Sequence, residues 1–194
     1  MRIVIATRNT GKLNEIQTLL AGQNVELVSA DALKAAPNVE EDAETLEENA
    51  AKKARVLHTY SGLASLADDT GLEVAALDNR PGVHSARYAG AQADDAANRK
   101  LLLSELADVA TRIARFRTVI AFVDKESNVH FFEGICSGII AEEERGSGGF
   151  GYDSIFIPDG LERTFAELSS AEKNAVSHRG RALRQFASFI REHD

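Results

Sequence analysis

The chain has 194 residues, of which 44% are hydrophobic, and its formal net charge is −8. This length is enough for one substantial core, so we expect residues 1–194 to form a single domain. The negative charge argues against a duplex nucleic-acid binder, because such proteins neutralise phosphates with excess Lys and Arg. A single cysteine, Cys136, excludes an intrachain disulfide. We expect a cytoplasmic protein, since no apolar run is long enough for a signal peptide or a membrane span.

The N-terminal segment has the pattern of a strand followed directly by a helix. Residues 3–6 are a continuous apolar run of strand length, and apolar residues recur at helical spacing between residues 13 and 20. The turn between them is a natural anion site, where free helix amides and the side chains of Thr7, Asn9 and Lys12 can meet phosphate oxygens. An ordinary glycine-containing turn with an exposed lysine explains the same residues equally well.

An acidic segment lies further along the chain. Residues 40–48 contain six carboxylates and lead into a predicted helix, on which Asn49 and Lys53 share one face and could reach the same ligand. A solvated surface is the simpler interpretation of each of these residues alone. Glu40 and Glu41 are of interest as a third carboxylate for a site that needs more than two.

Two adjacent carboxylates, Asp68 and Asp69, follow the apolar run 63–67, which we predict to be a strand. We expect Gly71 to supply the backbone freedom for a turn directly after them. The desolvation and mutual repulsion of neighbouring acids must be offset by a cation or by donors, so a divalent metal is one interpretation. A solvated turn in which one aspartate caps a backbone amide is the other.

The remaining elements follow from hydrophobic periodicity. We predict strands at 25–29 and 155–157, a helix at 94–106, and a hairpin of two strands at 114–125 and 129–140. The pattern at 72–77 does not decide between strand and helix. The segment 79–90, with Ser85, Arg87 and Tyr88, is either a loop near a ligand or plain surface.

The richest glycine cluster, residues 146–151, contains Phe150 and is followed by Tyr152. Glycines allow the backbone to approach a planar ligand while an aromatic ring stacks on it, so a nucleobase is a reasonable guest. A flexible loop is the default alternative.

Two helical pieces are predicted near the C-terminus. Ser169 and Glu172 form a capping box, and Ser177 is a second candidate N-cap. Three basic residues lie around the interruption between the pieces, and we weigh ligand contact and a structural role about equally for them: Lys173, His178 and Arg179.

Six motifs in order resemble the inosine triphosphate pyrophosphatase family, house-cleaning enzymes that hydrolyse non-standard purine nucleoside triphosphates. They are TxNxxK from Thr7, ENAxxKA at 48–54, DDTG at 68–71, SARYAG at 85–90, GGFGYD at 148–153 and EKNAVSHR at 172–179. The resemblance implies an α/β fold of two lobes, elongated around a long mixed β-sheet with flanking helices, with the nucleotide in the cleft between the lobes. It also implies a homodimer.

The same resemblance implies Mg²⁺-dependent cleavage of ITP, dITP and XTP to the nucleoside monophosphate and pyrophosphate. By motif position, Asp69 would accept the proton of water, and the metal would be held by Asp68, Asp69 and a glutamate of the pair Glu40 and Glu41. The implied substrate contacts are Thr7, Asn9, Lys12, Lys53, Thr70, Phe150, Gly151, Tyr152, Asp153, Lys173, His178 and Arg179.

Physical chemistry agrees with these roles, because phosphoanhydride hydrolysis needs charge neutralisation and a positioned water. Discrimination is expected at the purine 6-position, where a backbone amide or the cluster of Lys173, His178 and Arg179 could donate to a keto oxygen. Two alternatives stay open: a non-catalytic nucleotide-binding or sensing protein, and a related pyrophosphatase for modified pyrimidine nucleotides. Arg8 stands where the family often has a small residue, and it either points to solvent or adds a phosphate contact.

Overall fold

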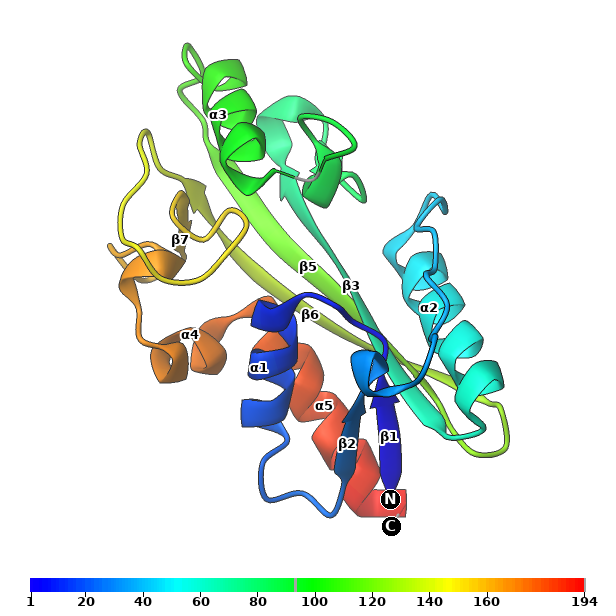
Figure 1. The fold of residues 1–194 in the computed structure, drawn as a ribbon. Helices are drawn as coiled ribbons and strands as arrows, with labels where there is room; N and C mark the ends of the chain where they lie inside the picture. Colours follow the sequence, from blue (N-terminus) through cyan, green and yellow to red (C-terminus); the bar gives the residue numbers. More distant parts are fainter. Residues whose placement is uncertain (93, 194) are drawn as a thin grey trace. The chain divides into compact units, whose positions relative to one another are not determined.

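The computed structural model describes residues 1–92 and 94–193 (Figure 1). The predicted domain, 1–194, therefore includes two positions, 93 and 194, that lie outside the described residues. The helices are α1 (Thr10–Leu19), α2 (Leu46–Ser61), α3 (Asp95–Glu105), α4 (Ser170–Val176) and α5 (His178–His193). The strands are β1 (Arg2–Ile5), β2 (Glu26–Ser29), β3 (Ala64–Val74), β4 (Pro81–Gly82), β5 (Ile113–Val123), β6 (Val129–Ile140) and β7 (Phe156–Pro158).

The strands form one mixed sheet in the order β2-β1-β3-β5-β6-β7, with β4 paired to β3. Strand β1 is parallel to both of its neighbours, and Ile5 lies opposite Ser29 of β2 and Leu66 of β3. Strands β4 and β7 pair antiparallel with β3 and β6. The predicted α/β class, with a mixed sheet and flanking helices, is confirmed.

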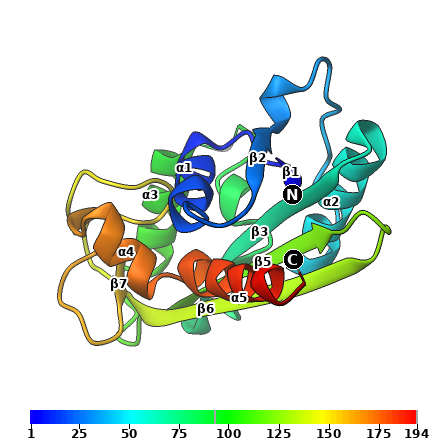
Figure 2. The same cartoon turned by 90° about the horizontal axis from the view of Figure 1, so that it is seen from below.

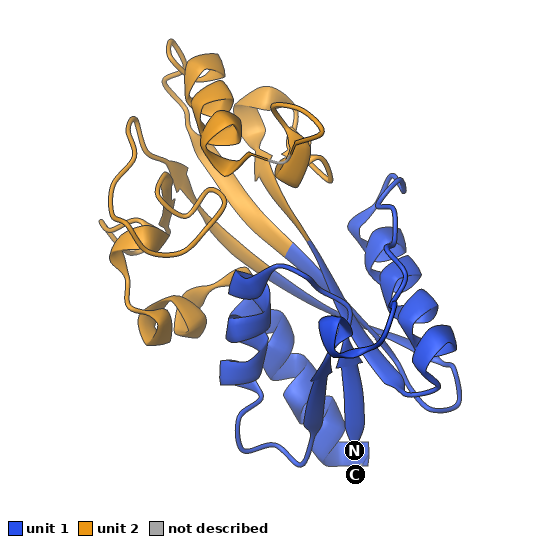
Figure 3. Ribbon diagram, viewed as in Figure 1, with its two compact units in different colours: residues 1–69, 118–134, 179–194 blue, residues 70–117, 135–178 orange. Residues whose placement is uncertain are grey.

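The chain divides into two compact units (Figure 3). Unit 1 comprises residues 1–69, 118–134 and 179–194, and unit 2 comprises residues 70–117 and 135–178. Each unit has its own apolar core: one buried cluster, which includes Phe186, lies in unit 1, and a second, which includes Phe156, lies in unit 2. Among the described residues, no helix combines the length and the apolar character that crossing a membrane requires.

The core of unit 1 lies between α5 and the strands beside it. Phe186 of α5 packs against Phe122 of β5 and Phe132 of β6, with ring centroids 5.1 and 5.5 Å apart. Ile5 of β1 and Ile16 of α1 complete this core and are fully buried. The N-terminus before β1 and the end of α5 at His193 both belong to this unit (Figure 2).

Strand β3 is longer than the sequence indicates, and this overturns one expectation. The predicted strand ended at residue 67 and turned at Gly71, whereas β3 runs on through both aspartates to Val74. Gly71 has another purpose: a Cβ atom there would lie 2.7 Å from the carbonyl oxygen of Gly82. The glycine therefore permits β4 to approach closely, and Asp68 and Asp69 project from a strand instead of a turn.

The undecided segment 72–77 is shared between two elements. Its first part is the end of β3, and residues Ala75–Leu77 form a short 3₁₀ helix. The two strands of the predicted hairpin are neighbours in the sheet, joined by a turn in which the Asp124 amide donates to the Asn128 carbonyl.

Candidate functional site

The turn between β1 and α1 forms as its sequence predicts. Asn9 is the N-cap of α1, and its side-chain oxygen accepts the Lys12 amide at 3.0 Å. Thr7 accepts the Asn9 amide at 3.2 Å. This leaves the first amides of α1 and the Lys12 ammonium at the positive end of the helix dipole, where an anion is favoured.

Arg8 points away from this turn. Its guanidinium donates to the side chain of Asn38 and the carbonyl of Ala36, and it lies 3.7 Å from the carboxylate of Asp31. The side chain is 52% exposed, in line with the solvent-facing alternative, and it also ties down the polar segment between β2 and α2.

The acidic segment before α2 is held by Asn49 and Lys53, which share one face of that helix. The Asn49 side chain accepts the Ala43 amide at 3.0 Å and donates to the Ala43 carbonyl at 3.4 Å. Lys53 donates to Glu41 at 2.8 Å. The shared face that the sequence suggested for a ligand thus binds the protein's own acidic segment and brings Glu41 over β3.

Lys53 is the centre of a buried cluster in unit 1. Its Nζ donates to Oδ1 of Asp69 at 3.0 Å and to the backbone carbonyl of Asp68 at 2.7 Å, in addition to Glu41. The lysine side chain is 9% exposed and that of Asp69 is 7% exposed. Three acceptors around one desolvated ammonium satisfy its three donor directions.

Burial and charge act against each other in this cluster. Burial raises the pKa of Asp69, and the opposing charge of Lys53 offsets this only in part. Burial alone would lower the pKa of Lys53, but the charges of Asp69 and Glu41 outweigh it and raise the pKa. Asp69 is thus the carboxylate in the cluster whose affinity for a proton is increased.

Asp68 has a different environment from Asp69. Its Oδ2 accepts from Nε and Nη2 of Arg179 at 3.1 and 3.0 Å and lies 3.2 Å from Nζ of Lys12. Burial alone would raise the pKa of Asp68, but the charges of Lys12 and Arg179 hold it well below its usual range. The two adjacent acids are therefore distinguished: the pKa of Asp68 is lowered and that carboxylate anchors cations, whereas the pKa of Asp69 is raised.

Arg179 also donates to Glu15, with Nη1 2.5 Å from Oε2. Lys12 and Glu15 are three residues apart on one face of α1. From that face Lys12 reaches Asp68 in the middle of β3, and Glu15 reaches Arg179. The four groups, two cationic and two anionic, neutralise one another where Arg179 is 2% exposed. The predicted substrate contact Arg179 is thus tied to Asp68 and α1.

The predicted metal ligands are brought together in part. Glu41 and Asp69 both contact Lys53, Asp68 faces Arg179, and Glu40 is exposed. Within residues 1–92 and 94–193, no group of three His, Cys, Asp or Glu side chains has an arrangement suited to a metal ion. The donor chemistry nonetheless fits Mg²⁺, which prefers one or two carboxylates supplemented by water and phosphate oxygens.

A second cluster lies in unit 2, around the glycine-rich segment 148–153, which we call the aromatic loop. Oδ2 of Asp153 accepts the Phe150 amide at 2.9 Å and Nζ of Lys173 at 2.6 Å. The same ammonium lies 4.7 Å from the centroid of the Phe150 ring. Asp153 and Lys173 are 5% and 7% exposed, so a buried ion pair holds its ammonium against the Phe150 ring.

Other predicted residues of unit 2 support this cluster. His178, at the start of α5, is 3% exposed and stacks on Phe116 with ring centroids 4.5 Å apart. Tyr152 donates to the carbonyl of Ser85 at 2.8 Å. Both side chains are therefore buried in the interior of unit 2.

The segment 79–90 divides between interior and surface. Ser85 is buried, where its hydroxyl accepts the Leu72 amide at 2.8 Å and donates to the Gly82 carbonyl at 2.6 Å. Tyr88 instead donates to Glu105, and burial together with this bond raises the pKa of Tyr88 to about 12.

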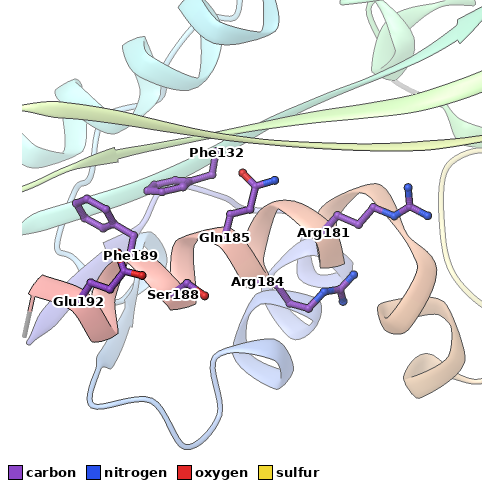
Figure 4. A pocket seen from close by; sticks show the side chains of 7 residues that line it. All are labelled: Phe132, Arg181, Arg184, Gln185, Ser188, Phe189 and Glu192. Atoms are coloured by element: carbon purple, nitrogen blue, oxygen red, sulfur yellow. The ribbon is translucent and has the colours of Figure 1, made fainter.

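A groove of about 540 Å³ opens along α5 and β6 in unit 1 (Figure 4). Its lining residues are Phe132, Arg181, Arg184, Gln185, Ser188, Phe189 and Glu192. None of these is a predicted site residue, so the groove is not part of the candidate site around Lys53.

Sequence reasoning did not find Glu15, Asp95 or Arg99, each of which contacts a predicted site residue. Glu15 lies one helical turn after Lys12, and Asp95 and Arg99 form an acid and base pair four residues apart. That spacing was the available signal, but it is also what an ordinary solvated helix shows.

The model of the Ham1 family matches residues 3–189 of the chain. The chain is 50% identical over 190 residues to the dITP/XTP pyrophosphatase of Porphyromonas gingivalis, covering 97% of each protein. It is also 50% identical over 184 residues to the dITP/XTP pyrophosphatase of Geobacter sulfurreducens, covering 94% of this chain and 92% of that protein. Among solved structures, a HAM1 protein from Coxiella burnetii is 42% identical, with a TM-score of 0.90 and 99% of each chain covered.

Proposed function

Because the chain belongs to the Ham1 family, as its motifs led us to expect, we propose that it hydrolyses non-standard purine nucleoside triphosphates such as ITP, dITP and XTP. The products are the nucleoside monophosphate and pyrophosphate. Two relatives that are each 50% identical to the chain bear the name dITP/XTP pyrophosphatase. The structural observation that carries the proposal is the buried Asp69, whose raised pKa suits a proton acceptor, beside the anion-binding turn of α1.

The proposed reaction is attack by a water oxygen on the α-phosphorus. The new P–O bond forms as the bond from the α-phosphorus to the bridging oxygen of the β-phosphate breaks, and pyrophosphate leaves. Asp69 accepts the proton released by water. A carboxylate whose pKa is raised by burial is a stronger base than an exposed one, and Lys53 keeps its Oδ1 in a defined position 3.0 Å away.

The triphosphate is assigned to the turn between β1 and α1. Thr7 and Asn9 shape that turn by capping the helix, and Lys12 supplies a point charge to the phosphate oxygens. Lys12 lies 3.2 Å from Asp68, so the carboxylate holds the ammonium in place before substrate arrives. Asp68, kept ionised by Arg179 and Lys12, acts here as an anchor for cations.

Mg²⁺ is the proposed cofactor, and it would supply charge neutralisation for the triphosphate. Glu41 and Asp69 would hold it, since both carboxylates already face one cation, the ammonium of Lys53. Asp68 and Glu40 remain the further candidates from the sequence. Lys53 itself is proposed to balance the negative charge of these acids while they are shielded from bulk water.

The purine base is assigned to the aromatic loop of unit 2. Phe150 presents the stacking ring, and Gly151, Tyr152 and Asp153 shape the backbone next to it. Lys173 and His178 are the proposed donors to the 6-keto oxygen. Thr70, the residue after Asp69, and Arg179, which is bonded to Asp68, are kept as proposed substrate contacts.

The test is incubation of the purified protein with Mg²⁺ and a panel of ITP, dITP, XTP, GTP and modified dUTP or dTTP, with products separated by ion-exchange chromatography. We expect monophosphate and pyrophosphate from ITP, dITP and XTP. Binding of ITP without turnover would replace the proposal with a nucleotide-binding protein. Orthophosphate as the first product would exclude cleavage between the α and β phosphates, and preferred turnover of the pyrimidines would move the enzyme to another substrate class.

We also propose that the protein acts as a homodimer in the cytoplasm. The support is the family membership and the single buried cysteine, which is typical of a reducing compartment. Light scattering coupled to size-exclusion chromatography gives the mass directly, and a monomeric mass at assay concentration would exclude the dimer.

A further inference from the structure

Both backbone polar groups of Gly151 are bound by side chains of α3. The Gly151 amide donates to Oδ2 of Asp95 at 2.8 Å, and Nη1 of Arg99 donates to the Gly151 carbonyl at 2.8 Å. Asp95 and Arg99 are four residues apart, so they lie on one face of the helix and reach the same peptide unit. Gly151 has a φ of +61°, a left-handed conformation that glycine adopts readily. We call Asp95 and Arg99 the α3 clamp.

The arginine of the α3 clamp is itself held in place. Its Nε donates to Oε2 of Glu144 at 2.8 Å, and the same oxygen accepts the Ser154 hydroxyl at 3.0 Å. The Arg99 side chain is only 18% exposed. A planar guanidinium bound on two edges cannot rotate without breaking both contacts, so Arg99 fixes the loop to the segments on either side of it.

The aromatic loop is also fixed on its other side. The Phe150 amide donates to Asp153, whose carboxylate pairs with Lys173. Tyr152 donates to the buried carbonyl of Ser85. Phe150 is therefore followed directly by Gly151, whose amide and carbonyl are both bound. These bonds restrict the backbone that carries the Phe150 ring.

A purely structural reading is that α3 simply satisfies polar groups of a loop. However, water can satisfy the hydrogen bonds of an exposed loop backbone, and ordering the loop costs conformational entropy. A favourable contribution elsewhere must offset that cost. A loop that presents an aromatic ring gains affinity for a planar ligand when it is ordered in advance, because the ordering does not have to occur on binding. The clamp supplies that ordering from a different element, more than fifty positions away in the sequence.

We propose that Asp95 and Arg99 are positioning residues that set the affinity of the protein for the purine base by holding the aromatic loop in its binding conformation. The proposal rests on the proposed function, since it assigns a base to Phe150. It predicts that the clamp acts through KM and leaves the hydrolytic step nearly unchanged.

The first experiment measures steady-state kinetics with dITP for Arg99→Met and Asp95→Ala. We expect KM to rise roughly tenfold, as for the loss of one or two hydrogen bonds, with kcat within about twofold of wild type. Asp95→Asn keeps an oxygen that can accept the Gly151 amide, and we expect it to restore most of the affinity. The control is Asp94→Ala, which removes the N-cap of α3 and should lower the melting temperature without changing KM.

The second experiment separates positioning from general destabilisation. In a Phe150→Leu background the clamp has no ring to position, so Arg99→Met should raise KM no further, a coupling that a double-mutant cycle measures. Fully additive effects, an unchanged KM in folded Arg99→Met, or an equal effect of Asp94→Ala would each overturn the proposal.

A third measurement does not depend on hydrolysis. The chain contains no tryptophan, so Phe150→Trp places a single reporter on the loop. We expect the fluorescence anisotropy of that reporter to fall when Arg99→Met is added and to stay constant with Asp94→Ala. If the wild type fails to hydrolyse dITP while the anisotropy still falls, the proposed function is wrong and loop positioning stands. If hydrolysis occurs and the anisotropy does not change, the clamp is overturned and the proposed function is kept.

Discussion

Nζ of Lys53 lies 3.0 Å from Oδ1 of Asp69, so a buried cation accompanies the carboxylate that we propose as proton acceptor. The lysine is also bonded to Glu41, which extends the pair to a group of two acids around one ammonium. An ion group of this kind adds little net stability when complete, but removing one partner leaves buried charge uncompensated. Substitution of Lys53, the centre of the cluster, should therefore reveal the cost of leaving the two acids uncompensated.

Lys53→Met should destabilise the protein by about 3 kcal/mol, because Glu41 and Asp69 would then face each other without a cation. We also expect Mg²⁺ to raise the melting temperature of this variant more than that of the wild type, since the ion would supply the positive charge that Lys53 no longer provides to Glu41 and Asp69. Thermal denaturation with and without Mg²⁺ measures both effects.

Lys52→Met is the matched control, because Lys52 pairs with Asp42 at the surface, where the lysine is 39% exposed. We expect less than about 0.5 kcal/mol of destabilisation there. Equal losses in the two variants, or equal Mg²⁺ shifts, would show that Lys53 does not balance the charge of Glu41 and Asp69.

Asp69→Asn should lower kcat for dITP by roughly a thousandfold, the range of an essential general base, while dITP binding changes little. The amide keeps the shape of the side chain but has a negligible affinity for a proton. Single-turnover kinetics and equilibrium dialysis measure the two quantities separately. Glu73→Gln is the control on the same strand, since Glu73 pairs with Arg115 outside the cluster. Retention of more than a tenth of wild-type turnover by Asp69→Asn would exclude Asp69 as the base.

Local patterns were sufficient for the elements that surround the site. The apolar run before Thr7 and the helical spacing after it predicted β1 and α1, because a buried strand and an amphipathic helix have different periods. Gly71 was assigned to a turn since glycine in isolation indicates one, whereas its actual purpose depends on Gly82, eleven residues away. A close approach of two backbones leaves no trace in the local sequence.

The pairing of charges could not be predicted for a related reason. The side chain of Lys53 contacts residues 12 and 16 positions away, and Arg179 contacts Asp68 at a separation of 111 positions. Several acids near Glu41 in the sequence carry the same carboxylate group. Only the folded structure determines that Glu41 is the one that contacts Lys53. The motif order identified the family, but the opposite pKa shifts of Asp68 and Asp69, one lowered and one raised, follow from the tertiary structure.

Glu172 should make the stability of the protein depend on pH below about 4.5. Its bonds to Arg163 and Ser169 lower the pKa of this carboxyl from 4.5 to about 2. A lowered folded pKa means that the stabilisation is complete above the unfolded value and is lost as pH falls toward 2. The melting temperature of the wild type should therefore exceed that of Glu172→Gln at pH 7, and the difference should shrink by pH 3.

Glutamine can still cap α4, so the comparison isolates the charge of Glu172. The control is Glu162→Gln, which replaces an exposed carboxylate nearby and should change the melting temperature little. A difference for Glu172→Gln that stays constant from pH 7 to pH 3 would contradict the assignment of the pKa shift.

Gly149→Ala should abolish high-affinity dITP binding by displacing the carboxylate beneath the aromatic loop. A Cβ atom at Gly149 would lie 2.0 Å from Oδ2 of Asp153, the oxygen that binds both the Phe150 amide and Lys173. Since Gly149 has a φ of +72°, the substitution also strains the backbone. Gly160→Ala controls for that strain, because Gly160 has a φ of +81° and nothing lies within 4 Å of its Cβ position. We expect both variants to lose stability and only Gly149→Ala to lose dITP affinity in calorimetric titration. Equal affinities would show that Asp153 does not hold the loop for the base.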